Sequence, residues 1–300
     1  MPAVFGSTDP ARTAPAPWLF LSALSLALSG CGGATPLLHP AHTLAPGKVM
    51  FSGGVSGTFI AGDAKQSLEE ARAITSSGGV ESDEDRKALT EGTLVSVLAA
   101  PGLAPWVGGR VGVAERTEAG IGYTGRWARL DVRHALEDRK FALSLGVAGL
   151  VMLSHPSADP AEPSGTSSAV SGVDSNGAYG FGVSVPVIVG YRSDAELVQA
   201  WGGVVAGFEQ AMGDVVLAKP WEVTPSDEVP DILETKLDAH RFSGAVLVGL
   251  AVGIQPIWVA VEISGRYFSI DGTMRGGSTV AKGDFTGVSI EPAGAILGRF

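Results

Sequence analysis

The sequence predicts an all-β chain that folds as one antiparallel, up-and-down transmembrane β-barrel of about ten strands, with eight as the alternative. From residue 47 onward, bulky apolar residues recur at every second position, which is the period of a strand and not of a helix. The positions between them are mostly Gly, Ala and Ser, and charged residues make up only 17% of the chain. This alternation fits a sheet with lipid on its bulky side and a narrow interior on the other.

The N-terminus has the features of an export signal. Trp18 to Ser29 is an uncharged apolar run, too short to span a bilayer comfortably as a helix. Leu28-Ser29-Gly30-Cys31 resembles the lipobox of bacterial lipoproteins. The resemblance implies that residues 1–30 are a signal peptide and that Cys31 is lipidated at the mature N-terminus. The alternative is an ordinary secretory signal that ends near Gly33.

The composition of the chain after the signal excludes several classes of protein. Residues 31–46 are rich in Pro, Gly, Ala and Thr and have no apolar period, so we expect a lipidated N-terminus and a flexible tether. The barrel then occupies residues 47–300. A single cysteine excludes a disulfide framework and a CxxC metal or redox motif, and the net charge of −10 argues against nucleic acid as a partner.

The strand pattern is clearest in YGFGVSVPVIVGY, from Tyr179 to Tyr191, where one face is entirely Tyr, Phe and Val. We expect that face to contact acyl chains, with aromatic residues at the two membrane interfaces. The predicted strands are 47–61, 93–100, 105–116, 119–133, 140–153, 178–192, 196–210, 241–254, 256–270 and 284–300. Ten strands and alternating short and long connections place both termini on the periplasmic side.

The connections and irregular positions carry further predictions. Long external loops are expected at 62–92, 154–177 and 211–240, with a short helix from Asp63 to Ser76 and an unusually brief connection at Thr117-Glu118. Because proline cannot donate to a ladder, we expect bulges at Pro186 and Pro292.

Two segments bear on how the chain enters the membrane. The terminal Phe300 resembles the insertion signal of bacterial outer-membrane barrels, which implies barrel-insertion machinery as a partner. Phe242 to Val261 has no charge and could be taken for a transmembrane helix. Its glycines and the turn-forming Gln255-Pro256 favour a strand hairpin instead.

A set of charged residues is predicted to face the lumen. In a barrel this narrow we expect these side chains to pair in a structural network that fills the interior, because an unpaired buried charge is costly. A selectivity ring or ligand site is the alternative. The set is Arg110, Arg126, Glu209, Arg241, Glu262, Arg266 and Glu291.

Catalytic candidates are few. Asp83 and Asp85 in the first long loop, with Asp238 and His240 at the end of the third, resemble in residue type and placement the omptin outer-membrane proteases. That resemblance implies peptide hydrolysis by water that a carboxylate-oriented histidine activates. A lipid-modifying barrel would need a Ser-His pair, for which Ser154-His155 and the isolated His134 offer no acidic partner. No cofactor or metal motif is present in the sequence.

These patterns together predict an outer-membrane β-barrel lipoprotein of a Gram-negative bacterium, anchored by lipid on the periplasmic side and surrounded by outer-membrane lipids. A non-enzymatic role in surface interaction, envelope structure or narrow passage is favoured. The alternatives are an outer-membrane enzyme, protease or lipid-modifying, and a periplasmic lipoprotein whose soluble barrel binds a hydrophobic ligand.

Overall fold

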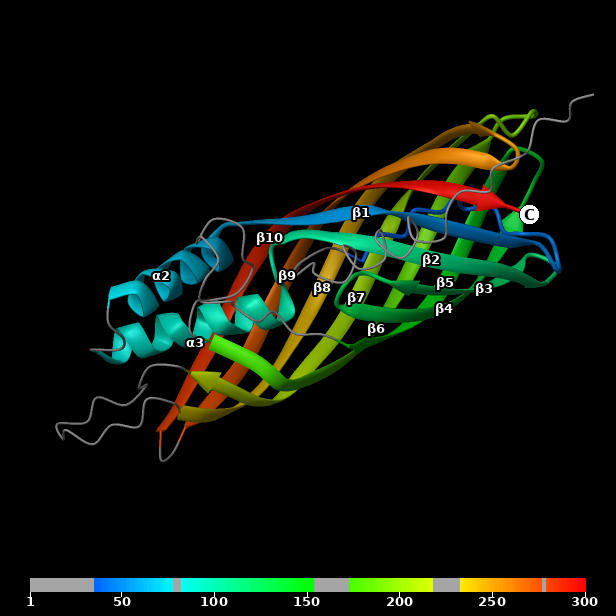
Figure 1. Cartoon of the computed structure of the whole chain (residues 1–300). Coiled ribbons are helices and arrows are strands. Elements are labelled where there is room, and N and C mark those ends of the chain that lie inside the picture. The colour runs from blue at the N-terminus through cyan, green and yellow to red at the C-terminus, as the bar shows by residue number, and fades with distance from the viewer. Residues whose placement is uncertain (1–34, 78–81, 154–172, 218–232, 277–278) are drawn as a thin grey trace, which may run out of the picture.

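The computed structural model describes residues 35–77, 82–153, 173–217, 233–276 and 279–300. They form ten antiparallel strands that close into one barrel in chain order, which confirms the predicted fold. Figure 1 shows a tilted cylinder with two helices at one end and the C-terminus at the other. The strands are β1 (Val49–Ala61), β2 (Gly102–Ala114), β3 (Thr117–Tyr123), β4 (Trp127–Glu137), β5 (Phe141–Met152), β6 (Val173–Arg192), β7 (Val198–Leu217), β8 (Leu233–Ile254), β9 (Ile257–Gly276) and β10 (Thr279–Arg299).

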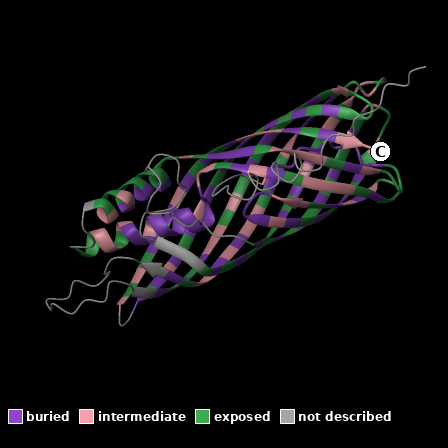
Figure 2. Cartoon of the chain, in the orientation of Figure 1, coloured by how far each residue is buried: buried purple, intermediate pink, exposed green. Residues whose placement is uncertain are grey.

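The wall alternates as the sequence predicts. Along β5 and β9 buried and exposed residues alternate almost without a break, and Figure 2 shows the same banding around the barrel. Phe141 is 63% exposed and Val246 is 64% exposed, whereas the Ala and Ser residues between such positions are buried. A β-strand places successive side chains on opposite faces, so the bulky set covers the outside.

The barrel has an end with short turns. The β2–β3, β4–β5, β6–β7 and β8–β9 connections lie there, beside the start of β1 and the C-terminus. Outer-membrane barrels have short periplasmic turns. We therefore assign this end to the periplasm and the end with the helices to the outside.

The wall has two heights. Ala61 ends β1 opposite Val288, which lies nine residues into β10. On the other side of the barrel, Val151 of β5 pairs with Phe181, eight residues into β6. The strands β6 to β10 therefore project outward past β1 to β5 by about 20 Å, at about 3.3 Å per residue and a tilt of about 40°. We call β6–β10 the high wall and β2–β5 the low wall.

Two strand predictions are wrong, and the errors cancel in the count. Residues 93–100 lie mainly in α3 (Asp83–Leu98) and not in a strand. A capping box at Ser82 and Asp85 starts this helix, and packing of its last turns overrides the strand preference of their β-branched residues. Residues 119–133 form parts of two strands, β3 and β4, because the chain turns at Thr124–Arg126.

The connections differ from the prediction in the same way. The helix predicted from Asp63 to Ser76 is confirmed as α2 (Asp63–Ser77). Much of the predicted loop 211–240 instead extends β7 and β8, and Thr117-Glu118 belongs to β3, so the turn is one step earlier. Residues 154–172, with Ser154 and His155, lie outside the described residues.

The prolines interrupt the ladder without a bulge. Pro186 stays in register with Val205, and Pro292 with Ile263. On the opposite side, the pairing with β5 or with β1 lapses and resumes in the same register. The missing N–H therefore removes hydrogen bonds on one side only, and the expected bulges are wrong.

Phe242 to Val261 forms the hairpin of β8 and β9, so the helical alternative is wrong. Among the described residues, neither helix has the length and apolar character needed to cross a membrane.

Candidate functional site

The lumen is the candidate functional site because the buried polar side chains point into it, and its periplasmic half holds residues 35–46. We expected this segment to be a flexible tether, but Leu37, Leu38 and Leu44 are at most 4% exposed. They pack in a cluster with Trp106, Trp201 and other inward residues of the wall. The segment is the plug of the periplasmic half, and we call it the N-terminal plug.

Glu262 of β9 binds the upper part of the N-terminal plug. Its carboxylate accepts the main-chain N–H groups of Leu37 at 2.9 Å and Leu38 at 3.0 Å. The indole N–H of Trp201 donates to the same carboxylate at 2.9 Å. This buried carboxylate is therefore satisfied by three donors and not by an arginine, which differs from the ion pair expected for it.

The lower part of the plug is bound from β3 and β4. Arg133 donates to the carbonyl oxygens of Pro40 at 2.6 Å and His42 at 3.0 Å. Glu118 accepts the N–H of Leu44 at 2.8 Å, while Glu137 accepts the hydroxyl of Thr43 at 2.7 Å. The wall side chains thus take the place of water for a main chain that has no strand partner.

A charge network supports these contacts. Arg110 pairs with both Glu118 and Asp131, and Arg133 Nε donates to Glu118 at 2.7 Å. Arg129 lies 3.3 Å from Asp131. All five side chains are at most 8% exposed, so each carboxylate compensates buried arginines that would be costly alone.

A second network crosses the middle of the lumen. Arg266 donates to Glu291 at 2.8 and 3.1 Å, and Ser264 and Ser289 donate to the same carboxylate. Arg241 lies 2.6 Å from Glu209. Residues Arg110, Arg241 and Arg266 are therefore paired as the structural interpretation of the lumen charges expects.

The external half is filled by α3. Leu94, Val95 and Val97 are fully buried against the inner face of the high wall, including Phe268 and Ile270. A Cβ placed on Gly272 of β9 would lie 2.9 Å from a methyl of Leu94, so this glycine lets the helix approach the strand closely. Arg126 links α3 to the low wall through the carbonyl of Ser96 at 3.1 Å.

Little space remains between these closures. Three lumen cavities lined by described residues each have a volume of about 20 Å³. A space of that size holds about one water molecule. Within the described chain the lumen is a packed interior, with the N-terminal plug below and α3 above.

The alternation that identifies the lumen charges also runs through residues that the sequence prediction missed. In β4, Arg129, Asp131, Arg133 and Glu137 all face inward. Their signal was available, because WARLDVRHALE alternates charged with apolar residues at every second position from Arg129 to Arg133. The assignment of 119–133 to a single strand hid it.

The omptin-like residues do not come together. Asp85 caps α3 and Asp83 pairs with Arg86, at a helix that packs on the inner face of the high wall. Asp238 contacts Gln210 at 3.3 Å on the outer face of β8. The ring of His240 lies 5.7 Å from that of Phe242, also on the outer face.

The remaining candidates for chemistry are isolated. His134 is exposed near the periplasmic end of β4, where its ring contacts the hydroxyl of Thr117. No group of three or more His, Cys, Asp or Glu side chains that could hold a metal occurs among the described residues.

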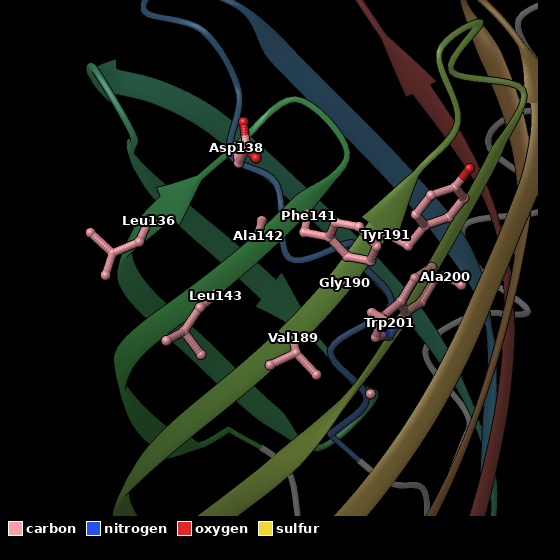
Figure 3. Close-up of a pocket in the computed structure, with 11 residues that line it drawn as sticks. Leu136, Asp138, Phe141, Ala142, Leu143, Val189, Gly190, Tyr191, Ala200 and Trp201 are labelled. Atoms are coloured by element: carbon pink, nitrogen blue, oxygen red, sulfur yellow. The ribbon is translucent and has the colours of Figure 1, made fainter.

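The outer wall has one apolar groove near the periplasmic turns, with a volume of about 600 Å³ (Figure 3). Leu143, Val189 and Tyr191 border it, while the small residues Ala200 and Gly202 of β7 leave it open. An acyl chain is the ligand that suits such a lining on a lipid-facing wall.

No protein-family model and no curated protein matches this chain. Among solved structures it is similar to Ail, the attachment invasion locus protein of Yersinia pestis, with 13% identity, coverage of 85% of this chain and 99% of that chain, and a TM-score of 0.31. Neisserial surface protein A has 12% identity, coverage of 84% and 96%, and a TM-score of 0.31. A major outer membrane protein from Thermus thermophilus has 10% identity, coverage of 84% and 99%, and a TM-score of 0.34.

At these identities and TM-scores the likeness carries no functional conclusion. The closed ten-stranded sheet, its apolar outer wall and its polar, filled lumen define the chain as an outer-membrane type of β-barrel protein.

Proposed function

We propose that the protein is a sealed outer-membrane barrel whose high wall, braced by α2 and α3, is an interaction platform at the cell surface. The observation that carries this proposal is a change of polarity along the outer face of β8 and β9. From Ile254 up to Phe242, and from Ile257 up to Tyr267, the exposed large residues are apolar. Beyond them the outward positions are Lys236, Asp238, Asp271 and Arg275.

That change supports a membrane boundary at Phe242 and Tyr267, because aromatic residues collect at the interfaces of membrane barrels. The projecting part of the high wall then stands in external solvent. Its inner face is covered by α3, which itself packs against α2 through a close approach at Gly92. Such bracing favours a permanent surface over a loop that orders only on binding.

The filled lumen supports a binding role over passage. An open channel needs a continuous aqueous path, whereas the described lumen is packed along its length. We expect the purified full chain in planar lipid bilayers to show no steady conductance above that of the bilayer alone. A large, stable conductance would argue for the narrow-channel alternative.

Adhesion of cells tests the platform directly. We expect a Gram-negative host that expresses the protein to be retained on cultured epithelial cells or immobilised matrix proteins. The double variant Lys236→Glu, Arg275→Glu, which changes two paired neighbours on the platform, should lose most of that retention. Arg139→Glu, Lys140→Glu is the matched control, because it makes the same charge change in a periplasmic turn.

Equal retention by the two double variants would contradict the platform. So would retention no greater than that of the host without the protein. Surface labelling and heat-modifiable migration in gels must first show that both variants are folded and inserted.

Lipidation of Cys31 is a separate part of the proposal and rests on Leu28-Ser29-Gly30-Cys31. We expect metabolic incorporation of a labelled fatty acid into the wild-type protein and none into Cys31→Ala. Mass spectrometry of the mature N-terminus would distinguish this modification from an ordinary cleavage near Gly33.

A further inference from the structure

We infer that the lumen is a binding site for an extended main chain, occupied by residues 35–46, and that the chain before Thr35 leaves the barrel at the cell surface. The inference is independent of the platform and of lipidation. It follows from the order in which the N-terminal plug contacts the wall.

Contacts along β4 fix that order. Thr43 donates to Glu137, the last residue of this strand, and the carbonyl oxygens of His42 and Pro40 accept from Arg133. Thr35 shares a small cavity with Trp127, the first residue of β4. The plug therefore runs beside the whole strand, with Thr35 at its external end.

The two ends of the plug are anchored consistently. At the periplasmic end Pro46 pairs with Gly112 beside the β2–β3 turn, and Gly47 donates to the same residue at 2.8 Å before β1 begins. At the external end the cavity beside Thr35 is also lined by Leu98, from the last turn of α3. The segment thus reaches from the periplasmic rim to the C-terminal end of α3.

The depth covered is that of a membrane. β4 has 11 residues, which at about 3.3 Å per residue and a tilt of about 40° span about 25 Å along the barrel axis. The apolar band of an outer-membrane barrel is also about 25 Å tall. Thr35 therefore lies near the external limit of the bilayer.

The low wall supplies an exit. Trp127 follows the external β3–β4 turn, whereas α3 packs on the inner face of β7 to β10. The helix therefore covers the lumen on the high side, and Thr35 lies beside the rim on the low side. A chain that precedes Thr35 has its shortest way out over this rim.

The binding is by main chain, which defines the class of ligand. Four N–H groups of the plug, on Leu37, Leu38, Thr43 and Leu44, donate to wall carboxylates, and two of its carbonyl oxygens accept from Arg133. None of these bonds requires a particular side chain on the plug. The site therefore suits an extended polypeptide, and the occupant is the chain's own N-terminal segment.

The position of Cys31 is limited by this arrangement. It precedes Thr35 by four residues, and a chain of that length reaches at most about 14 Å. The periplasmic membrane surface is about 25 Å from Thr35, the height of the apolar band. With the plug seated, an acyl chain on Cys31 would enter the external leaflet beside the low wall, and not the periplasmic leaflet that the sequence predicts.

A crosslink tests whether the plug is seated in membranes. A Cβ on Gly190 of β6 would lie 2.8 Å from the Cβ of Ala41, so Ala41→Cys, Gly190→Cys needs only a small shift to form a disulfide. We expect oxidation of outer membranes to crosslink most of this variant. Ala41→Cys, Gly202→Cys is the matched control and should not crosslink, because Gly202 borders the groove on the outer wall.

A tag tests on which side the chain emerges. A short epitope inserted between Gly33 and Ala34 in the full chain should bind antibody on intact cells, within about twofold of the same epitope placed between Ser164 and Gly165 in the β5–β6 connection. The same epitope between Asp138 and Arg139, in a periplasmic turn, should bind only after permeabilisation.

Each result decides the inference. A crosslink together with a surface-exposed N-terminal tag supports it. No crosslink in a barrel that migrates as folded overturns the seated plug, and a tag silent until permeabilisation overturns the external exit. Loss of adhesion in the platform variant changes neither result, so failure of the two proposals can be distinguished.

Discussion

The two halves of the lumen are closed by different physical means. The N-terminal plug in the periplasmic half is bound through its main chain by Glu118, Arg133 and Glu262. In the external half, α3 satisfies its own main chain and presents Leu94 and its neighbours to an apolar wall. The first closure depends on a few charged groups, and the second on the volume of many side chains.

This difference implies different responses to substitution. Removing one charged wall residue leaves buried partners unpaired, so the loss should be abrupt and should spread to the rest of the network. Removing part of an apolar side chain leaves a cavity, whose cost depends on how far the surroundings relax. Substitutions outside both closures should have the smallest effects.

Glu118→Leu should have the largest effect. Its carboxylate pairs with Arg110 and Arg133 and accepts the N–H of Leu44, all in a buried site. Breaking a buried ion pair by removing one partner costs about 3–5 kcal/mol. We expect a loss of that size in the free energy of unfolding, measured by urea titration of the refolded barrel in lipid or detergent. Glu115→Leu, in the exposed adjoining turn, should change it by less than about 0.5 kcal/mol.

A result for Glu118→Leu no larger than for Glu115→Leu would remove the proposed distinction between the two closures. Hydrogen exchange gives a second measure on the same variant. The amide of Leu44 should lose protection, while amides in α3 should keep theirs.

Leu94→Ala tests the apolar closure. Leu94 is fully buried and reaches Gly272 and Gly283 of two neighbouring strands. Truncation of such a leucine costs about 2–5 kcal/mol, and we expect about 3 kcal/mol here. Hydrogen exchange in α3 should become faster, while crosslinking between Ala41→Cys and Gly190→Cys should not change. Leu130→Ala on the outer wall, where the side chain is 65% exposed, is the control.

Reduced crosslinking in Leu94→Ala would show that the two closures are coupled. The lumen would then hold one continuous core and not two independent ones.

Glu262→Leu isolates the main-chain binding from the ion pairs. The substitution leaves the N–H groups of Leu37 and Leu38 and the indole N–H of Trp201 without an acceptor. Unsatisfied buried donors cost about 1–3 kcal/mol each, and local relaxation toward water should limit the sum to about 2–3 kcal/mol. Glu262→Gln keeps an acceptor oxygen and should lose less than half as much. Equal losses in the two variants would mean that charge, and not hydrogen bonding, holds the plug.

The sequence could predict the wall better than the contents of the lumen. Tyr179 to Tyr191 alternates so regularly that its outward face follows from period alone, and every bulky residue named there except Val187 is at least 36% exposed. Arg241, Arg266 and Glu291 follow from the same parity. A strand has only two faces, so a repeated pattern identifies both of them.

The contents are not periodic, and this is why they were missed. Thr93 to Leu98 has the composition of a strand, and only the capping box before it and the packing after it make it helical. The N-terminal plug has no regular secondary structure, so nothing in its own residues indicates the wall carboxylates that bind it. Partners such as Leu37 and Glu262 are 225 residues apart in the chain.

Ser82→Ala should have a smaller and more local effect than the lumen variants. The Ser82 hydroxyl accepts from the N–H of Asp85 at 3.1 Å, and the Asp85 carboxylate accepts from the N–H of Ser82 at 3.0 Å. Loss of an N-cap costs about 1 kcal/mol. We expect fraying of the first turn of α3 by hydrogen exchange, with the buried amides near Leu94 still protected. Loss of protection along the whole helix would show that the cap, and not the apolar packing, holds α3 in place.

Lys140→Met should have the smallest effect, because it lies outside both closures. Lys140 in the β4–β5 turn is 2.7 Å from Asp194 in the β6–β7 turn, and this hydrogen-bonded ion pair raises the pKa of Lys140 above its ordinary value of 10.5. A lysine pKa that is higher in the folded state favours folding fully below about pH 10.5, and the contribution is lost as pH rises through the raised pKa. The difference in melting temperature between wild type and variant should therefore be small at neutral pH, shrink in high salt and vanish at strongly alkaline pH. A difference that persisted there would show that the Lys140 stem stabilises the turns by packing, independently of its charge.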